Sequence, residues 1–182
     1  MFSLILRCKN ALMEQKEHAY FIDACRRGDL EEVQQMCGLF PQLINEKDVK
    51  GFTPLIIAVY NNQPGVASGL LQHGAVVDAQ DAAGNTALMG ACFKGYNDLA
   101  ALLLNTGAAI NLRNFQGAPA LTFAATFGQL QIAELLLKSG AYSNLADVRG
   151  KTSMDHASMQ ENSAMVELLQ RYVQNNQTAP LE

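Results

Sequence analysis

Apolar and small residues recur along this chain with a fixed period of 33 residues. One leucine column, one alanine column and two glycine columns stay in register without an insertion. The columns hold Leu55, Leu88, Leu121 and Met154; Ala58, Ala91, Ala124 and Ala157; Gly51, Gly84, Gly117 and Gly150; and Gly74, Gly107 and Gly140. A period in the range of about 20–50 residues indicates an architecture of stacked repeats, in which each unit buries the apolar face of its neighbour.

Each period predicts a polar turn followed by two short helices. An Asp or Asn opens the turn, and a Gly three residues later suits a backbone conformation that other residues avoid. Thr is then suited to a helix N-cap, and Pro54 to the first helical turn. The second helix is predicted to bury Val66, Leu70 and Leu71, or the equivalent apolar residues of later copies, on one face.

Two further columns mark the ends of helices and turns. Gly95, Gly128 and Asn62 are expected to end the first helices with a left-handed residue, and the second glycine column to cap the second helices. The polar columns hold Asp48, Asp81, Asn114 and Asp147, and Asp78, Asn111 and Asn144.

The residues in these columns resemble the ankyrin repeat. The stretch 48–58 reads DVKGFTPLIIA, which is similar to the turn of that family followed by its T-P-L-H-x-A signature. It departs from the signature at Ile56, where the family has His. The helix endings at 70–75 and 136–141 also look like the family. The resemblance covers residues 48–173, and a degenerate copy around 24–33 precedes them.

This resemblance implies an all-α fold, an ankyrin-repeat solenoid of about five helix-turn-helix repeats with β-turn tips. The expected domain organisation is an N-terminal capping helix or leader segment at 1–16, an ankyrin-repeat domain at 17–173 and a polar C-terminal tail at 174–182. The expected repeats are 17–47, 48–80, 81–113, 114–146 and 147–173.

Composition narrows the classes of function. The formal net charge is −4 and the basic residues are scattered, which argues against a nucleic-acid partner. No apolar run approaches the roughly 20 residues that span a bilayer, so we expect no membrane partner. The four cysteines form no C-x-x-C pair and the three histidines lie far apart, so we expect reduced thiols and neither a metal nor a cofactor. We expect a cytoplasmic protein, with a secreted or periplasmic one as the alternative.

The motifs in the sequence do not indicate an enzyme. The chain has no nucleophile elbow, phosphate-binding loop or metalloprotease motif. Asp155 and His156, beside Ser153 or Ser158, are the nearest approach to a catalytic triad. They fall in the signature of the last repeat, where a helix is expected, and no strained nucleophile turn accompanies them.

The resemblance implies that partner contacts come from the turn tips and from the exposed face of each first helix. Carried over by column, the candidate partner-binding residues are Val49, Phe52, Tyr60, Asn85, Phe93, Lys94, Phe115, Gln116, Phe127, Arg149 and Lys151. Five of them are aromatic, and aromatic side chains are enriched at protein interfaces. The basic residues nearby favour a partner with apolar and some acidic side chains. The alternative is that several of the rings pack between neighbouring repeats as core.

The predicted function is therefore a protein–protein interaction module, an adaptor or inhibitor that binds a partner protein through the concave ankyrin surface as a monomer. One alternative is a structural homodimer that pairs the same apolar face. A further alternative is a small-molecule-binding or hydrolytic protein that uses the groove. A concentration-dependent mass distinguishes the homodimer, and a deep pocket with perturbed titratable groups would favour the last.

Overall fold

The computed structural model of this protein describes residues 2–174, and the side chains of residues 15–173. The chain divides into two compact units, unit 1 (Met1–Val76) and unit 2 (Val77–Glu182), and each is described by itself. All regular elements of the described residues are helical apart from two isolated β-bridges, which confirms the predicted all-α class. Most of the tail predicted at 174–182 lies outside the described residues.

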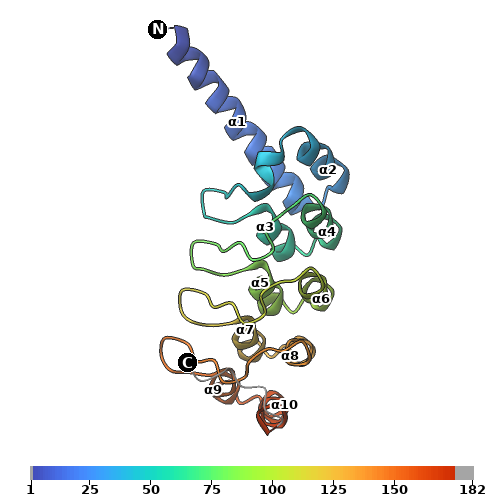
Figure 1. Cartoon of the computed structure of the whole chain (residues 1–182), viewed down its shortest axis with the longest axis vertical. Coiled ribbons are helices and arrows are strands. Elements are labelled where there is room, and N and C mark those ends of the chain that lie inside the picture. The colour runs from blue at the N-terminus through green and yellow to red at the C-terminus, as the bar shows by residue number, and fades with distance from the viewer. Residues whose placement is uncertain (1, 175–182) are drawn as a thin grey trace. The chain divides into compact units, whose positions relative to one another are not determined.

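Unit 1 contains α1 (Phe2–Arg27), α2 (Leu30–Leu39), the 3₁₀ helix η1 (Pro41–Asn45), α3 (Pro54–Tyr60) and α4 (Pro64–Gln72). Helix α1 packs against α3, and α2 packs against α4, as expected for two stacked helix pairs. Helix α1 is continuous, so the segment 1–16 and the first helix of the first repeat share one helix from Phe2 onward (Figure 1). The structure has η1 where later repeats have a Gly-Ala ending.

Unit 2 contains α5 (Ala87–Lys94), α6 (Asn97–Asn105), α7 (Ala120–Thr126), α8 (Leu130–Lys138), α9 (Ser153–Met159) and α10 (Ser163–Gln174). The first helices α5, α7 and α9 pack on one another in order, and the second helices α6, α8 and α10 do the same. Within this unit, Figure 1 shows the long turns on one side of the first helices and the second helices on the other. We call the first of these the tip side.

The buried core follows the sequence columns. The alanine column is fully buried, which lets helices approach closely, and the leucine column beside it is buried at Leu55, Leu88 and Leu121. In the second helices, Leu70, Leu103, Leu136 and Leu169 are fully buried at equivalent positions. Leu71 is half-buried rather than buried, because it lies at the edge of the apolar face of α4.

The predicted caps and left-handed residues are present. The side chains of Thr53, Thr86 and Thr152 each accept a hydrogen bond from a backbone N–H in the first turn of the following helix. Both glycine columns have positive φ, and so do Gly95, Gly128 and Asn62, which confirms the predicted turn and cap geometry. The fourth member of that cap column is Glu161, with φ of 55°, which the sequence pattern did not predict.

A second polar column joins each repeat to the backbone of the next. In unit 1, the Asn45 amide donates to Gly74 O and accepts from Val76 N–H. In unit 2, the Asn111 amide makes the same pair of bonds with Gly140 O and Tyr142 N–H. Asp78 accepts only from Ala109 N–H, because a carboxylate has no hydrogen to donate. We call these residues the inter-repeat latch.

Candidate protein-binding surfaces

Each turn tip is built on one carboxylate or amide oxygen. Oδ1 of Asp147 accepts from Arg149 N–H at 2.8 Å and from Lys151 N–H at 3.0 Å. Oδ1 of Asp48, Asp81 and Asn114 accepts from the residues two and four positions later in the same way. The oxygen satisfies two backbone donors that have no helical partner, so the tip keeps one conformation.

In unit 2 the tips are also bonded to one another. Phe115 N–H donates to Ala83 O at 3.1 Å, and Val148 N–H donates to Gln116 O at 2.9 Å. Asn85 takes part in this connection, since its Oδ1 accepts from Asn114 Nδ2 at 2.8 Å. Asn85 is half-buried, and its amide also donates to Asp81, so the side chain orders two tips.

Three phenylalanine rings of unit 2 are exposed, Phe115 on a turn tip and Phe93 and Phe127 at the C-terminal ends of the first helices α5 and α7. Phe93, Phe115 and Phe127 retain 37%, 64% and 47% of their accessible surface. Phe93 and Phe127 meet edge to face, with ring centroids 4.5 Å apart and an interplanar angle of 81°. Phe93 and Phe127 therefore pack against each other between neighbouring repeats and still leave apolar surface in solvent.

Cations accompany the rings. Lys94 Nζ lies 5.9 Å from the centroid of Phe93, within the range of a cation–π contact. Gln116, Arg149 and Lys151 are exposed at the tips. The eight predicted residues of this unit, Asn85, Phe93, Lys94, Phe115, Gln116, Phe127, Arg149 and Lys151, form what we call the unit 2 tip surface.

The three predicted residues of unit 1 lie around a groove. Val49 is fully exposed at its tip, whereas Phe52 and Tyr60 are half-buried and face each other with ring centroids 6.2 Å apart. These three residues border a hollow of about 860 Å³, which we call the α1 groove. The buried side chains of Ile22 and Ile56 also line it.

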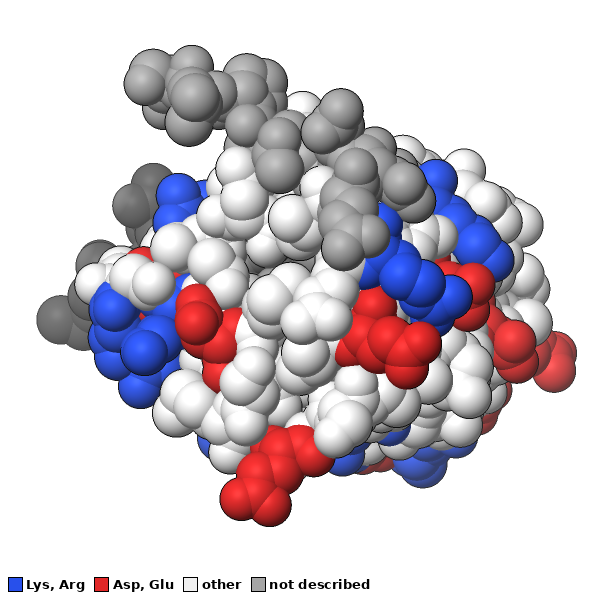
Figure 2. Space-filling view, turned by 90° about the horizontal axis from the view of Figure 1, so that it is seen from below, with Lys and Arg blue, Asp and Glu red and all other residues white. Residues whose placement is uncertain are grey.

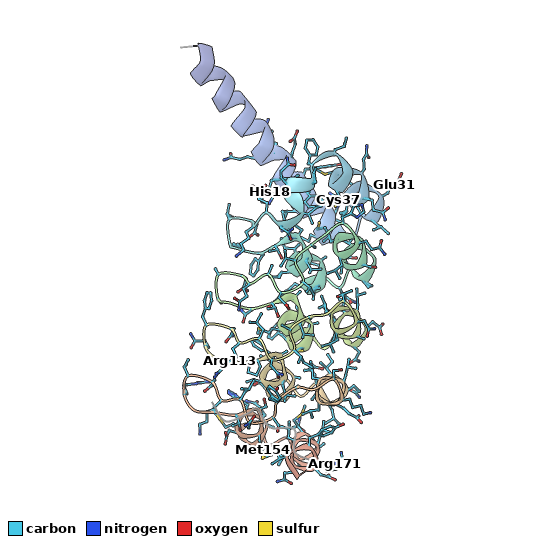
Figure 3. All side chains as sticks on the ribbon, in the orientation of Figure 1. His18, Glu31, Cys37, Arg113, Met154 and Arg171 are labelled. Carbon is cyan, nitrogen blue, oxygen red and sulfur yellow. The ribbon has the colours of Figure 1, made fainter. Side chains whose placement is uncertain are left out.

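Sequence reasoning missed the wall that α1 gives to this groove. The wall consists of Gln15, His18, Ala19, Ile22 and Arg26, which are spaced so that they share one helical face. Figure 3 shows His18 on α1, and its Nε2 lies 3.4 Å from the backbone oxygen of Glu46, which also lines the groove. The helical spacing of these residues was the available signal, but it could be interpreted only once α1 was known to continue to Arg27.

The residues nearest to a catalytic triad have structural roles. His156 Nε2 donates to Asp147 Oδ2 at 3.0 Å, and both side chains are buried. Backbone donation from Lys151, together with the contacts of His156 and Arg149, holds the pKa of Asp147 well below its usual range. The hydroxyl and N–H of Thr152 lower the pKa of Asp155, which caps α9. Ser153 Oγ lies 3.1 Å from Thr122 Oγ1, and the Ser158 hydroxyl donates to Met154 O, so neither serine contacts His156 as a nucleophile would.

The cysteines behave as small core residues. Cys25, Cys37 and Cys92 are buried free thiols, and Cys8 lies outside the described side chains. Burial raises the pKa of Cys25 to about 12 and also raises those of Cys37 and Cys92, so these thiols stay protonated and unreactive at neutral pH.

The described residues contain neither a metal-binding cluster nor a membrane-spanning helix. No group of three or more His, Cys, Asp or Glu side chains there is arranged to hold a metal ion. None of the helices there combines the length and apolar character that a membrane span requires.

The repeat geometry agrees with a comparison against known families. The sequence model of a family described as ankyrin repeats, which represents three copies of the repeat, matches residues 21–114 and, a second time, residues 88–179. The two matches overlap and span most of the 182 residues, including both units. On these matches, the chain belongs to the ankyrin-repeat family, whose members are in general protein–protein interaction modules.

Proposed function

We propose that this protein is an adaptor or inhibitor that binds a partner protein through the unit 2 tip surface. The observation that carries the proposal is the exposure of Phe93, Phe115 and Phe127 within a single unit, two of them in ring contact with each other. Val49, Phe52 and Tyr60 of unit 1 are proposed as a second group of contacts around the α1 groove.

The energetics of apolar burial favour this proposal. Complete burial of a Phe side chain contributes about 1.5–3 kcal/mol of favourable free energy. Each of these three residues still exposes between a third and two-thirds of its surface. Aromatic residues are also enriched in the central, desolvated parts of protein interfaces. The rings stand on helices and on tips bonded to each other, so little conformational freedom remains to be lost on binding.

The proposed activity needs no catalytic step. Ankyrin-repeat proteins are typically non-catalytic interaction modules. In unit 2, Asp147 and His156 bond to each other, and Asp155 bonds to Thr152, so these groups serve the fold. The protein would therefore act by covering a surface of its partner or by holding the partner in place.

Capture from a lysate tests the proposal. The native chain and a variant carrying Phe93→Ser, Phe115→Ser and Phe127→Ser would be used as bait in parallel, with helical content measured by circular dichroism. The control variant carries Leu39→Ser and Val173→Ser, which remove exposed apolar residues from the second helices α2 and α10 instead.

We expect the native chain and the control to capture the same partner, and the folded triple variant to lose it. Equal capture by all three would show that binding lies elsewhere, for example at the α1 groove. If the triple variant unfolds, the three single variants would be compared, beginning with Phe115, which has the largest exposed fraction of the three rings.

The same reagents distinguish a homodimer. Light scattering would measure the mass of the native chain and of the triple variant over a hundredfold range of concentration. A monomeric mass throughout is the expected result. A mass that doubles for the native chain only would mean that the exposed rings pair with a second copy of this chain.

A further inference from the structure

The exposed charges on the tip side of unit 2 are positive. Lys94 ends α5, Arg113 precedes the tip after α6, and Arg149 and Lys151 lie on the tip before α9. All four side chains are exposed. The Arg113 guanidinium donates to the backbone oxygens of Gly117 and Ala146, which fixes its position without neutralising its charge.

The carboxylates near these cations are turned inward. Asp81 and Asp147 are buried and accept hydrogen bonds from the backbone of their own tips. Asp155 caps α9 through Thr152. Arg149 makes one long contact, of 3.4 Å, with Asp147 Oδ2 and keeps 70% of its side chain exposed. The negative charge on this side is therefore internal, and the positive charge faces solvent.

Acidic residues appear on the opposite side of the unit. Asp98 is on α6, Glu134 is on α8 and Glu167 is on α10. There a cation has a carboxylate partner, since Lys138 Nζ lies 2.8 Å from Glu134 Oε1. Figure 3 shows Arg113 among the turns and Arg171 on α10, and Figure 2 shows a group of Lys and Arg side chains at the left edge of the C-terminal end. Unit 2 thus carries mixed charges on the side of its second helices, where Lys138 and Arg171 accompany the acidic residues, and exposed cations among its turns.

We infer that the partner contacts the unit 2 tip surface with a segment in which Asp or Glu residues flank Leu, Ile or Phe. This inference rests on the proposed function and specifies its partner. Apolar side chains of such a segment cover the exposed rings, while its carboxylates meet Lys94, Arg149 and Lys151.

A nucleic acid is the competing anion, since rings and cations also suit stacked bases. The chain argues against it in two ways. The net charge is −4, and the opposite side of unit 2 carries exposed acidic residues. A polyanion with a charge at every nucleotide is repelled by that background, whereas a short segment with a few carboxylates contacts only the cations.

The experiment is a selection from a displayed library of random 12-residue peptides. The native full chain is used as bait, followed by affinity measurements by fluorescence anisotropy on the enriched peptides. The charge variant carries Lys94→Glu, Arg149→Glu and Lys151→Glu. The matched control carries Lys138→Glu, which reverses a cation on α8 of the same unit. A 12-nucleotide oligothymidine serves as the competing anion.

We expect the selected peptides to be enriched in Asp and Glu and in large apolar residues relative to the unselected library. The charge variant should bind them at least about tenfold more weakly, and the Lys138→Glu control within about twofold of the native chain. Affinity of the native chain should fall as NaCl rises from 50 to 300 mM, which tests the charge contribution even if the charge variant does not fold.

Several results would overturn the inference. Enrichment of neutral or basic peptides whose binding is lost in the Phe→Ser variant would refute the acidic partner and leave the proposed function standing. Unchanged binding by the folded charge variant, or an affinity that does not respond to salt, would do the same. Competition by the oligothymidine at equal concentration would assign the surface to nucleic acid. If no peptide is enriched on the native chain, the inference fails, whereas the proposed function is decided by the lysate capture.

Discussion

Unit 1 carries a groove bordered by α1 and a turn tip, whereas unit 2 carries three exposed rings. In unit 1 the α1 groove lies between the small side chain of Ala19 and the half-buried pair Phe52 and Tyr60. In unit 2 the rings of Phe93 and Phe127 meet each other and stay partly exposed. Both units use the same turn, with one Asp oxygen accepting two backbone N–H groups.

The difference comes from the positions that vary between repeats. Tyr60 and Phe93 occupy one column, and Phe127 occupies the next, so a ring on α5 can meet a ring on α7. The helix that packs on α3 within unit 1 is α1, which carries Arg26 and Arg27 near its end. Tyr60 therefore pairs with Phe52 of its own tip. The conserved geometry of a repeat thus leaves the character of its surface to a few side chains.

The largest expected effect is the loss of stability when a core leucine is truncated, which tests whether the two units have equivalent cores. Leu70→Ala in unit 1 and Leu136→Ala in unit 2 remove fully buried side chains from the same column. Each should lower the free energy of unfolding by about 2–5 kcal/mol, because each leaves a cavity between stacked helices. Urea unfolding followed by circular dichroism measures this loss.

The control for these core variants is Leu39→Ala, which truncates an exposed leucine of α2. It should change the free energy of unfolding by less than about 0.5 kcal/mol. If one of the core variants lowers the free energy of unfolding no more than Leu39→Ala does, the two units do not have equivalent cores.

The next effect tests the bonded tips of unit 2. Gly84 and Gly150 have similar φ, 81° and 73°, but only Gly84 lies against a neighbour. A Cβ at Gly84 would approach Phe115 N to 2.6 Å, whereas a Cβ at Gly150 would meet nothing within 4 Å. Gly150→Ala should cost about 1–2 kcal/mol through its backbone conformation alone. Gly84→Ala should cost about 1–2 kcal/mol more, because the Phe115 tip must move.

Thermal unfolding of both glycine variants measures this difference. The NMR signals of the Phe115 ring should shift in Gly84→Ala and stay in place in Gly150→Ala. Equal costs for the two variants would contradict the role of tip stacking in unit 2.

A smaller effect compares the inter-repeat latch of the two units. Asn45→Ala in unit 1 and Asn111→Ala in unit 2 each remove two hydrogen bonds to the backbone of the next repeat. Each should cost about 1–2 kcal/mol. Asp78→Asn should do the reverse and stabilise the chain by about 0.5–1 kcal/mol, because the amide gains the donor that the carboxylate lacks. Denaturant midpoints measure all three, and a destabilised Asp78→Asn variant would disprove this account of the latch.

The smallest effect at neutral pH is expected for Asp147→Asn, since Asn114 builds the same turn in the preceding repeat. The lowered pKa of Asp147 in the folded chain means that its carboxylate stabilises the fold above the ordinary pKa of Asp, near 4. That contribution is lost as pH falls further. The native chain should therefore exceed the variant in stability at pH 7, and the gap should close toward pH 2. Unfolding measured between pH 2 and pH 7 follows the gap, and a gap that widens in acid would contradict this assignment.

Most of the scaffold could be predicted from the sequence because it depends on backbone geometry. Gly and Asn mark left-handed positions, so Gly95, Gly128 and Asn62 were identified correctly. Glu161 was missed although the 33-residue period places it in the same column, because Glu does not itself favour a positive φ. Helix η1 was not predicted, because this segment lacks the Gly that ends the later repeats.

The surfaces were less predictable, because they depend on which side chains meet. The columns placed Phe93 and Phe127 on first helices, but their edge-to-face contact follows from rotamers and helix spacing. Asn85 was proposed as a partner-binding residue from its column alone. The amide group of Asn85 is hydrogen-bonded to Asp81 and Asn114, and a single sequence gives no means to predict these bonds.

The inter-repeat latch has a consequence for how such a chain can grow over evolutionary time. Asn111 bonds to backbone atoms of Gly140 and Tyr142, about one period further along, and requires no particular side chain there. A tandem duplication of one whole 33-residue period would therefore carry its own donor and acceptor and also supply the backbone that the preceding copy needs. A duplication of another length would move a latch residue out of register with the backbone that it bonds, so the latch favours insertions of whole periods.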